Sequence, residues 1–195
     1  GKAVEALPET TVASSFQLYQ ELGLRGEVNF PAFEQALKGF SRYASGQDRL
    51  LVLIDYTKPS TEKRFYILDL LQKKLLLSTY VAHGRGSGDN YAVAFSNRPG
   101  SYQSSLGFFR TGDTYMGKNG YSLFLDGLVK GINDKARERA IVVHGANYAD
   151  PAVLKGQQRL GRSLGCPALP PDISKQVIDT IKGGVLLYIY GLNKA

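Results

Sequence analysis

The chain has 195 residues, 43% of them hydrophobic and 21% charged, which predicts one globular domain with at most a small appendage and excludes a disordered chain. Its single cysteine excludes an intrachain disulfide, and with only two histidines present it also excludes structural zinc sites built from four such ligands. The net charge of +7 indicates an anionic partner, for which a nucleic acid, a phospholipid surface and an anionic cell-wall polymer all qualify.

The first 48 residues predict two helices. The first would begin after Ser14 and Ser15, which can cap a helix, and would end at Gly23; its apolar residues at helical spacing are Phe16, Tyr19 and Leu22. The second would begin near Asn29 and Pro31 and end at Gly46; its apolar face is formed by Phe33, Leu37, Phe40 and Ala44. We therefore expect a helical N-terminal segment.

From residue 50 onward the apolar residues come in short runs separated by glycine-rich loops, a pattern typical of β structure. The strands that it predicts are Leu50–Tyr56, Phe65–Leu70, Leu75–Val81, Ala92–Phe95, Tyr121–Leu125, Ala140–Val143 and Val185–Tyr190. One late helix is expected over Ile173–Ile181, because its apolar residues share one face and Gly183-Gly184 can end it. The fold class that follows is mostly β (α+β).

The distribution of charge divides the chain in the same place as the change in pattern. Residues 1–48 carry four basic and six acidic side chains, whereas residues 49–195 carry twenty and eleven. We expect the helical segment to cover 1–48 and the catalytic or binding domain to cover 49–195. No apolar run approaches the roughly 20 residues of a membrane span, and an exported form would have a signal peptide that is not present in this chain.

Two stretches in the C-terminal half could carry chemistry. His144 follows the apolar run 141–143, where a side chain can project from the end of a strand, and Cys166 closes the turn Ser163-Leu-Gly165-Cys166. A thiol, an imidazole and converging backbone N–H groups are the parts of a cysteine acyl-transfer site. Each residue also has an ordinary alternative, since a free cysteine is most often a small buried apolar residue and a lone histidine is most often structural.

The order of these pieces resembles the signature of the L,D-transpeptidases, the cysteine enzymes that cross-link bacterial peptidoglycan. The resemblance lies in His144-Gly, a spacer, and Ser163-x-Gly165-Cys166. Upstream, the stretch from Val81 to Gly88 and the stretch Asn97-Arg-Pro-Gly-Ser-Tyr102 are similar to a strand and a Pro-x-Gly turn of that domain, and Asn119-Gly-Tyr121 is similar to its aromatic lid tip. The resemblance covers roughly residues 50–190.

The motif departs from its commonest form at two positions. Typical members have histidine between the serine and the glycine, where this chain has Leu164, and often asparagine or arginine two residues after the cysteine, where it has Ala168. The sequence therefore resembles a divergent branch, the murein L,D-transpeptidase catalytic domain proteins. The departures concern recognition of the substrate carboxylate, for which Arg139 or Arg162 could substitute.

The resemblance implies an L,D-transpeptidase-like β-sandwich with the late helix. It also implies a monomer in the periplasm or outside the cell that acts on peptidoglycan stem peptides, needs no metal or cofactor, binds no nucleic acid and is acylated by carbapenems. Cys166 would attack the amide that joins diaminopimelate to D-alanine. His144 would take the thiol proton and supply it to the departing D-alanine amine, while a carbonyl such as that of Gly145 orients its ring. Backbone N–H groups near Gly165 and Cys166 would bind the oxyanion in the turn that begins at Ser163. An amine or water would then resolve the acyl-enzyme.

Further residues are candidates for substrate binding, each with an ordinary alternative. His83 could assist binding or proton transfer, or it could stabilise a glycine-rich turn. Tyr121 and Tyr148 could line the stem-peptide groove, or they could be surface aromatics. Arg139 and Arg162 could bind a peptide carboxylate by a bidentate contact, or they could be solvated.

Two other functions remain open from the sequence. A zinc peptidase could use His83, His144 and a carboxylate such as Asp89, although no HExxH pair is present. A non-catalytic basic module could bind cell-wall polymer or nucleic acid, with Cys166 only structural, although no nucleic-acid-binding signature accompanies the charge.

Overall fold

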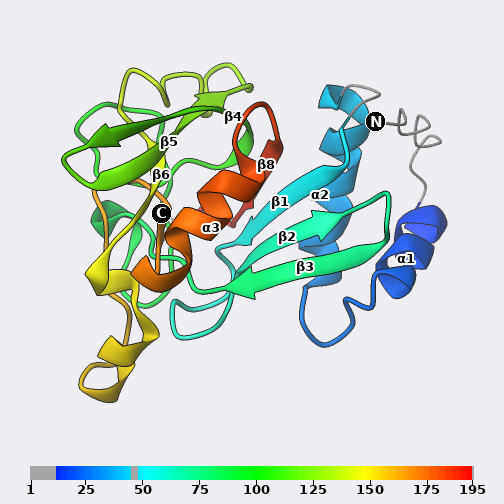
Figure 1. The fold of residues 1–195 in the computed structure, drawn as a ribbon, viewed down its shortest axis with the longest axis horizontal. Helices are drawn as coiled ribbons and strands as arrows, with labels where there is room; N and C mark the ends of the chain where they lie inside the picture. The colour runs from blue at the N-terminus through cyan, green and yellow to red at the C-terminus, as the bar shows by residue number, and fades with distance from the viewer. Residues whose placement is uncertain (1–11, 45–47, 195) are drawn as a thin grey trace.

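A computed structural model of the chain describes residues 12–44 and 48–194 (Figure 1). Its three α-helices are α1 (Val12–Glu21), α2 (Phe30–Tyr43) and α3 (Pro171–Ile181). All three expected helices are therefore present. Asn29 is the N-cap of α2 and a proline stands in its first turn, as the sequence predicts, whereas the expected end at Gly46 lies outside the described residues.

Eight strands form one sheet in the order β3-β2-β1-β8-β4-β5-β6-β7. Their bounds are β1 (Leu50–Asp55), β2 (Phe65–Asp69), β3 (Lys74–Thr79), β4 (Gly107–Gly117), β5 (Gly120–Gly127), β6 (Val142–Gly145), β7 (Ala168–Leu169) and β8 (Leu186–Tyr190). Most neighbours are antiparallel, and the parallel pairs are β1 with β8 and β6 with β7. The expected mostly β fold is confirmed.

Both faces of the sheet are covered, which explains the unbroken apolar run of β1. Along this strand Leu51 and Leu53 belong to the hydrophobic cluster shared with α1 and α2, whereas Val52 and Ile54 belong to the cluster shared with α3. This alternation follows from the two-residue period of a strand. Figure 1 shows α3 in front of the sheet and α2 behind β1 and β2.

The cluster beneath α3 shows how the sheet is shaped. It gathers buried residues from β1, β2, β4, β5, β6, β7 and β8 around the apolar face of α3, namely Val177, Ile178 and Ile181. Strands that lie far apart in the order of the sheet can share one cluster only if the sheet curves around it. The sandwich-like core is therefore enclosed by one continuous, curved sheet.

The structure corrects the strand predictions at three places. The strand expected over Ala92–Phe95 is wrong: the backbone N–H groups of Val93 and Ala94 both donate to the carbonyl of Ser87, so no partner strand is available to them. Strand β4 was not predicted, because its glycines at 107, 112 and 117 interrupt the apolar alternation. Strand β7 has only two residues and carries no periodic signal.

No helix in residues 12–44 and 48–194 combines the length and the apolar character that crossing a bilayer requires.

Candidate active site

A cavity of about 460 Å³ lies where the β4–β5 hairpin meets the loops around β6 and β7. Six of the residues predicted for the site line it: Arg139, His144, Tyr148, Arg162, Ser163 and Cys166. Two more, Tyr121 and Gly145, line an adjoining groove of about 470 Å³ that shares Tyr148 with the cavity. Only His83 and Gly165, of the predicted residues, line neither space.

The pairing of β6 with β7 brings the histidine and the cysteine into one neighbourhood. The two strands are parallel, with His144 opposite Ala168, and Cys166 precedes β7 by two residues. The backbone N–H of Val142 points at Sγ of Cys166 over 3.4 Å, and Sγ lies 3.4 Å from the carbonyl oxygen of Ala140. Ala140 adopts a left-handed φ of 56°, a conformation that costs a non-glycine residue energy and is often found at functional sites.

The turn before the cysteine is held by the hydroxyl of Ser163. This hydroxyl accepts the backbone N–H of Gly165 over 3.1 Å and donates to the carbonyl of Cys166 over 2.5 Å. Gly165 has a φ of +129°, and a Cβ at this position would lie 2.9 Å from the side chain of Ile141. The serine and the glycine of the motif are therefore both required by the local backbone.

The same contacts bear on which backbone N–H of the turn is free to act as the expected oxyanion donor. The N–H of Gly165 is already bound to Ser163 and is not free to bind a substrate oxygen. The backbone N–H of Cys166 makes no hydrogen bond to any of the residues that the structure describes. Like the N–H of Leu164, it therefore remains available as a donor.

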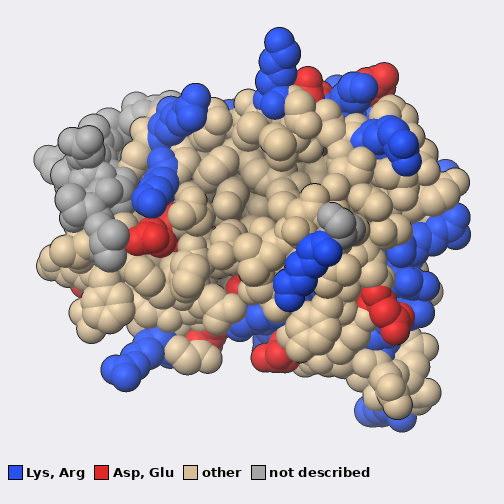
Figure 2. Space-filling view, turned by 180° about the vertical axis from the view of Figure 1, so that it is seen from behind, with Lys and Arg blue, Asp and Glu red and all other residues tan. Residues whose placement is uncertain are grey.

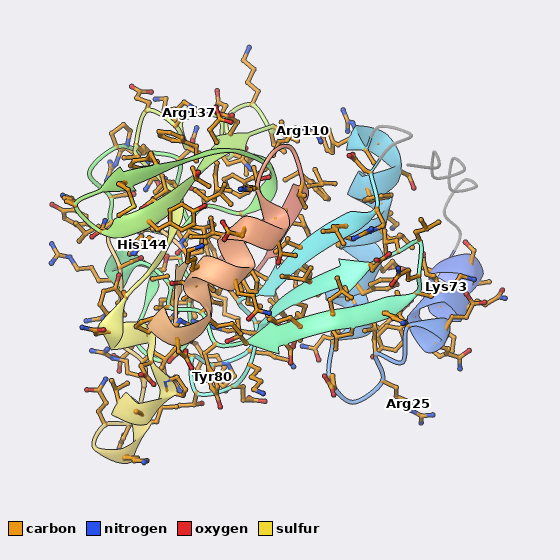
Figure 3. The ribbon with its side chains drawn as sticks, in the orientation of Figure 1. Arg25, Lys73, Tyr80, Arg110, Arg137 and His144 are labelled. Atoms are coloured by element: carbon orange, nitrogen blue, oxygen red, sulfur yellow. The ribbon has the colours of Figure 1, made fainter. Side chains whose placement is uncertain are left out.

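The ring of His144 is oriented by a backbone carbonyl. Its Nδ1 lies 2.9 Å from the carbonyl oxygen of Gly145, so Nδ1 carries the hydrogen and Nε2 is left as the basic nitrogen. The side chain lies in the part of the molecule formed by β4, β5 and β6 (Figure 3). This contact is the one that the sequence suggested for a histidine without an acidic partner.

Burial keeps both groups uncharged at neutral pH. It raises the pKa of the Cys166 thiol, an effect that the Val142 N–H and the charges of Arg139 and Lys118 only partly oppose. Burial also lowers the pKa of His144, partly opposed by its bond to the Gly145 carbonyl. The resting pair is thus a thiol and a neutral imidazole, and the imidazole is available to accept a proton.

His83 lies inside the protein, away from the cavity. Its Nδ1 is 2.8 Å from a guanidinium nitrogen of Arg64, which can only donate, so its Nε2–H donates to the carbonyl of Asp89 over 2.9 Å. Burial, followed by the nearby charge of Arg64, lowers the pKa of His83 to about 3. Both ring nitrogens are occupied, which is the arrangement of a histidine that stabilises the glycine-rich loop.

The two candidate arginines differ in what they can offer a ligand. Both terminal nitrogens of Arg139 already donate, to Ser96 O and Ser105 Oγ from Nη1 and to Ser101 Oγ and Gln103 O from Nη2. Since only Nε remains, Arg139 cannot form the bidentate contact expected of it. Arg162 contacts the carbonyls of Arg85 and Gly88 through Nη1 alone, so Nε and Nη2 are left for a ligand.

The two tyrosines also differ. Tyr148 is half-buried between the cavity and the groove, and burial, followed by the neighbouring Cys166 and Tyr56, raises its pKa to about 12. The hydroxyl of Tyr121 instead donates to Asp179 of α3 over 2.5 Å, and Lys175 lies over its ring. Tyr121 therefore belongs to the wall of the groove and is not at the tip of the hairpin.

The expected lid tip, Asn119-Gly-Tyr121, includes one residue of the actual tip and omits Lys118. The actual tip consists of Lys118 and Asn119 between the paired residues Gly117 and Gly120, and both tip residues line the cavity and the groove. The dipeptide Asn119-Gly120 is a recognised hairpin signal. That signal locates the tip without the structure.

The zinc alternative is not supported by the arrangement of its ligands. It needs His83, His144 and Asp89 to converge, but in residues 12–44 and 48–194 no three histidine, cysteine or acidic side chains lie close enough to hold a metal ion. Asp89 instead binds Arg159.

The basic side chains on the face seen in Figure 2 do not form the single patch that a polymer-binding module would need. Figure 2 shows the lysine and arginine side chains spread over the face seen from behind, with some acidic side chains between them. A nucleic-acid-binding face would gather them into one stripe or patch.

Comparison with protein families matches residues 24–190 to the L,D-transpeptidase catalytic domain, and comparison with curated proteins gives no match. A solved L,D-transpeptidase from Stackebrandtia nassauensis is similar at 14% identity and a TM-score of 0.46, over 100% of this chain and 95% of that one. The helical cell shape determining protein Pgp2 from Campylobacter jejuni is similar at 15% identity and a TM-score of 0.48, over 75% of this chain and 49% of that one. An L,D-transpeptidase from Mycobacterium smegmatis is similar at 13% identity and a TM-score of 0.45, over 73% of this chain and 59% of that one.

This chain spans less than two thirds of the length of the last two proteins, and the family assignment rests on the domain match, which extends from before α2 to the end of β8. The chain belongs to the L,D-transpeptidase catalytic domain family, whose members modify peptidoglycan.

Proposed function

We propose that this chain is a peptidoglycan acyltransferase in which Cys166 is the nucleophile and His144 the general base. One observation carries the proposal: the only thiol of the chain lines the same cavity as a neutral histidine whose Nδ1–H is held by the Gly145 carbonyl. A base oriented in this way can accept a proton at Nε2 while its ring stays fixed.

The first half-reaction forms an acyl-enzyme on a stem peptide. His144 Nε2 takes the proton of the Cys166 thiol, and the sulfur attacks the carbonyl carbon of the amide between diaminopimelate and D-alanine. The backbone N–H of Cys166 stabilises the oxyanion, a contribution of about 3 kcal/mol for one donor in comparable enzymes. When the carbon–nitrogen bond breaks, His144 gives its proton to the departing amine, and D-alanine leaves a thioester behind.

The second half-reaction resolves the thioester. A side-chain amine of diaminopimelate in a second stem, deprotonated by His144, attacks the same carbon and forms a 3–3 cross-link, and the proton returns to the sulfur of Cys166. Water in place of the amine yields a trimmed tripeptide stem, which is L,D-carboxypeptidase activity. We place this enzyme in the bacterial cell envelope, because the stem peptide is found there. We propose that it acts as a monomer, without metal or cofactor.

Covalent capture of Cys166 tests the proposal. The wild-type protein is incubated with a carbapenem, whose strained amide mimics the acyl donor, and its intact mass is measured alongside that of Cys166→Ala and His144→Ala. We expect one adduct on the wild type, none on Cys166→Ala and slow acylation of His144→Ala. A wild-type protein that stays unmodified, or an adduct that persists in Cys166→Ala, would falsify the nucleophile assignment.

Product analysis then separates the two outcomes of the second half-reaction. Purified disaccharide tetrapeptides are incubated with the enzyme, and the products are resolved by liquid chromatography and mass spectrometry. Cross-linked dimers indicate transpeptidation, and tripeptides alone indicate carboxypeptidase activity.

A further inference from the structure

The cavity that contains Cys166 is lined by positive charge without a compensating acid. Lys118, Arg139 and Arg162 are part of its wall, and no aspartate or glutamate is among its lining residues. A site with this balance favours an anionic group on the part of the ligand that it encloses.

The three cations are not equally free to bind that group. Arg139 uses both terminal nitrogens to hold the segment 96–105, and Arg162 spends one of its terminal nitrogens on Gly88 and Arg85. The ammonium of Lys118 forms no ion pair or hydrogen bond with the residues that the structure describes. Lys118 is therefore the cation with its whole donor capacity available.

The position of Lys118 also suits recognition. It stands at the two-residue tip of the β4–β5 hairpin and lines both the cavity and the adjoining groove, so its side chain borders the route along which a stem peptide would pass. Its charge acts on the cysteine, since Lys118 is one of the groups that oppose the rise in the pKa of the Cys166 thiol. A flexible ammonium at a hairpin tip can follow a carboxylate without a fixed planar geometry.

We propose that Lys118 is a specificity-determining residue that binds a carboxylate of the donor stem peptide in the cavity that the free edge of Arg162 also lines. This inference rests on the proposed function for the identity of the ligand. Two carboxylates of the donor flank the scissile amide: the C-terminal carboxylate of the leaving D-alanine and the carboxylate at the far end of the diaminopimelate side chain. Both have the same chemistry, and the experiment separates them.

The test measures binding independently of catalysis. The dissociation constants of three tetrapeptides are measured by calorimetry with the Cys166→Ala protein: the free acid, the peptide amidated at the D-alanine carboxylate, and the peptide amidated at the diaminopimelate side chain. The same peptides are then titrated into Cys166→Ala combined with Lys118→Gln, Lys118→Arg or Lys38→Gln. Lys38 is exposed on α2, on the face of the sheet opposite α3, and provides a control with the same loss of charge.

We expect Lys118→Gln to weaken binding of the free acid roughly tenfold, the cost of losing one hydrogen-bonded contact to a charged group. One of the two amidated peptides lacks the carboxylate that Lys118 binds. The dissociation constant of that peptide should be the same with and without Lys118→Gln, and this identifies the carboxylate. Lys118→Arg should retain most of the affinity, and Lys38→Gln should match the parent.

Three results would overturn the proposal: unchanged dissociation constants in Lys118→Gln, an equal loss for all three peptides, or no measurable binding of any of them. Acyl-enzyme formation by the wild type on the free acid is followed separately by mass spectrometry. A protein that binds the peptides in a Lys118-dependent manner but forms no acyl-enzyme would contradict the proposed function and leave the recognition intact.

Discussion

The guanidinium of Arg64 lies 2.8 Å from Nδ1 of His83, and both side chains are almost fully buried. Arg64 also donates to the carbonyls of Val81 and Lys58, and its charge lies over the ring of Tyr56. A charged arginine in the interior is tolerated because these neighbouring groups accept hydrogen bonds or present π electrons. Since the carbonyl of His83 in turn accepts the N–H of Ser163, this buried pair underlies the turn that carries Cys166.

The Arg64–His83 pair predicts a loss of stability in acid. Because burial, followed by the Arg64 charge, holds the pKa of His83 at about 3, the unfolded chain binds one proton more than the folded protein between pH 6.5 and about 3. The contribution of His83 to the free energy of unfolding is fully present above pH 6.5. Below that pH the free energy of unfolding decreases by about 1.4 kcal/mol per pH unit because of this histidine. Urea unfolding of the wild type and of His83→Asn at pH 7, 6, 5 and 4 measures the difference. The variant should start less stable and fall less steeply, and parallel slopes would contradict the prediction.

The burial of Cys166 predicts a thiol that reacts slowly at neutral pH. Because the pKa of this thiol is raised above its ordinary value, the thiolate fraction at pH 7 is small and grows about tenfold per pH unit. The alkylation rate with iodoacetamide, followed by intact mass between pH 6 and 9, should rise across this range without a plateau, because the pKa of the thiol lies above its ordinary value. Cys166→Ala serves as the blank, since the chain has no other thiol. A rate that is already constant between pH 6 and 8 would show a resting thiolate instead.

The two hydrogen bonds of Ser163 predict a role in positioning the cysteine. Ser163→Ala leaves the Gly165 N–H and the Cys166 carbonyl without their shared partner, which should cost about 1–3 kcal/mol of unfolding free energy. A displaced sulfur should also lower the rate of carbapenem acylation by roughly 100-fold. Ser163→Thr keeps the hydroxyl and should retain most of both quantities. Acylation of Ser163→Ala at the wild-type rate is the outcome that this account cannot accommodate.

Alanine variants of two glycines can separate the cost of a left-handed backbone from an effect on acylation. Gly165 and Gly183 both have a left-handed φ, but a Cβ on Gly165 would press on Ile141, whereas one on Gly183 meets nothing within 4 Å. Alanine should cost each position roughly 1 kcal/mol or more through its backbone conformation. Only Gly165→Ala should also lose acylation by carbapenem. If the two variants are acylated equally well, a Cβ at residue 165 does not disturb the turn that carries Cys166, and the prediction is wrong.

Much of the fold could be predicted because its signals are local. The apolar run of β1 and the helical spacing of Phe33, Leu37 and Phe40 depend only on neighbouring residues, and the structure confirms both elements. Strand β4 could not be predicted, because its three glycines hide the alternation and its pairing with β8 depends on residues about 80 positions away. The stretch 92–95 has the composition of a strand, but two of its backbone N–H groups donate to the nearby carbonyl of Ser87 and not to a partner strand.

The candidate site divides in the same way. The possible participants can be read from the residues alone: one thiol, two histidines and a serine–glycine turn whose residue types resemble those of the L,D-transpeptidase signature. Where each of them lies depends on the folded chain. The parallel pairing of β6 with β7 brings His144 to the cavity that Cys166 lines, whereas Arg64 holds His83 in the interior, although each histidine follows two apolar residues and precedes a glycine. The hydrogen-bond partners of Arg139, Arg162 and Lys118 come from distant segments or are absent among the described residues, so which cation stays free to bind a ligand is a property of the folded chain alone.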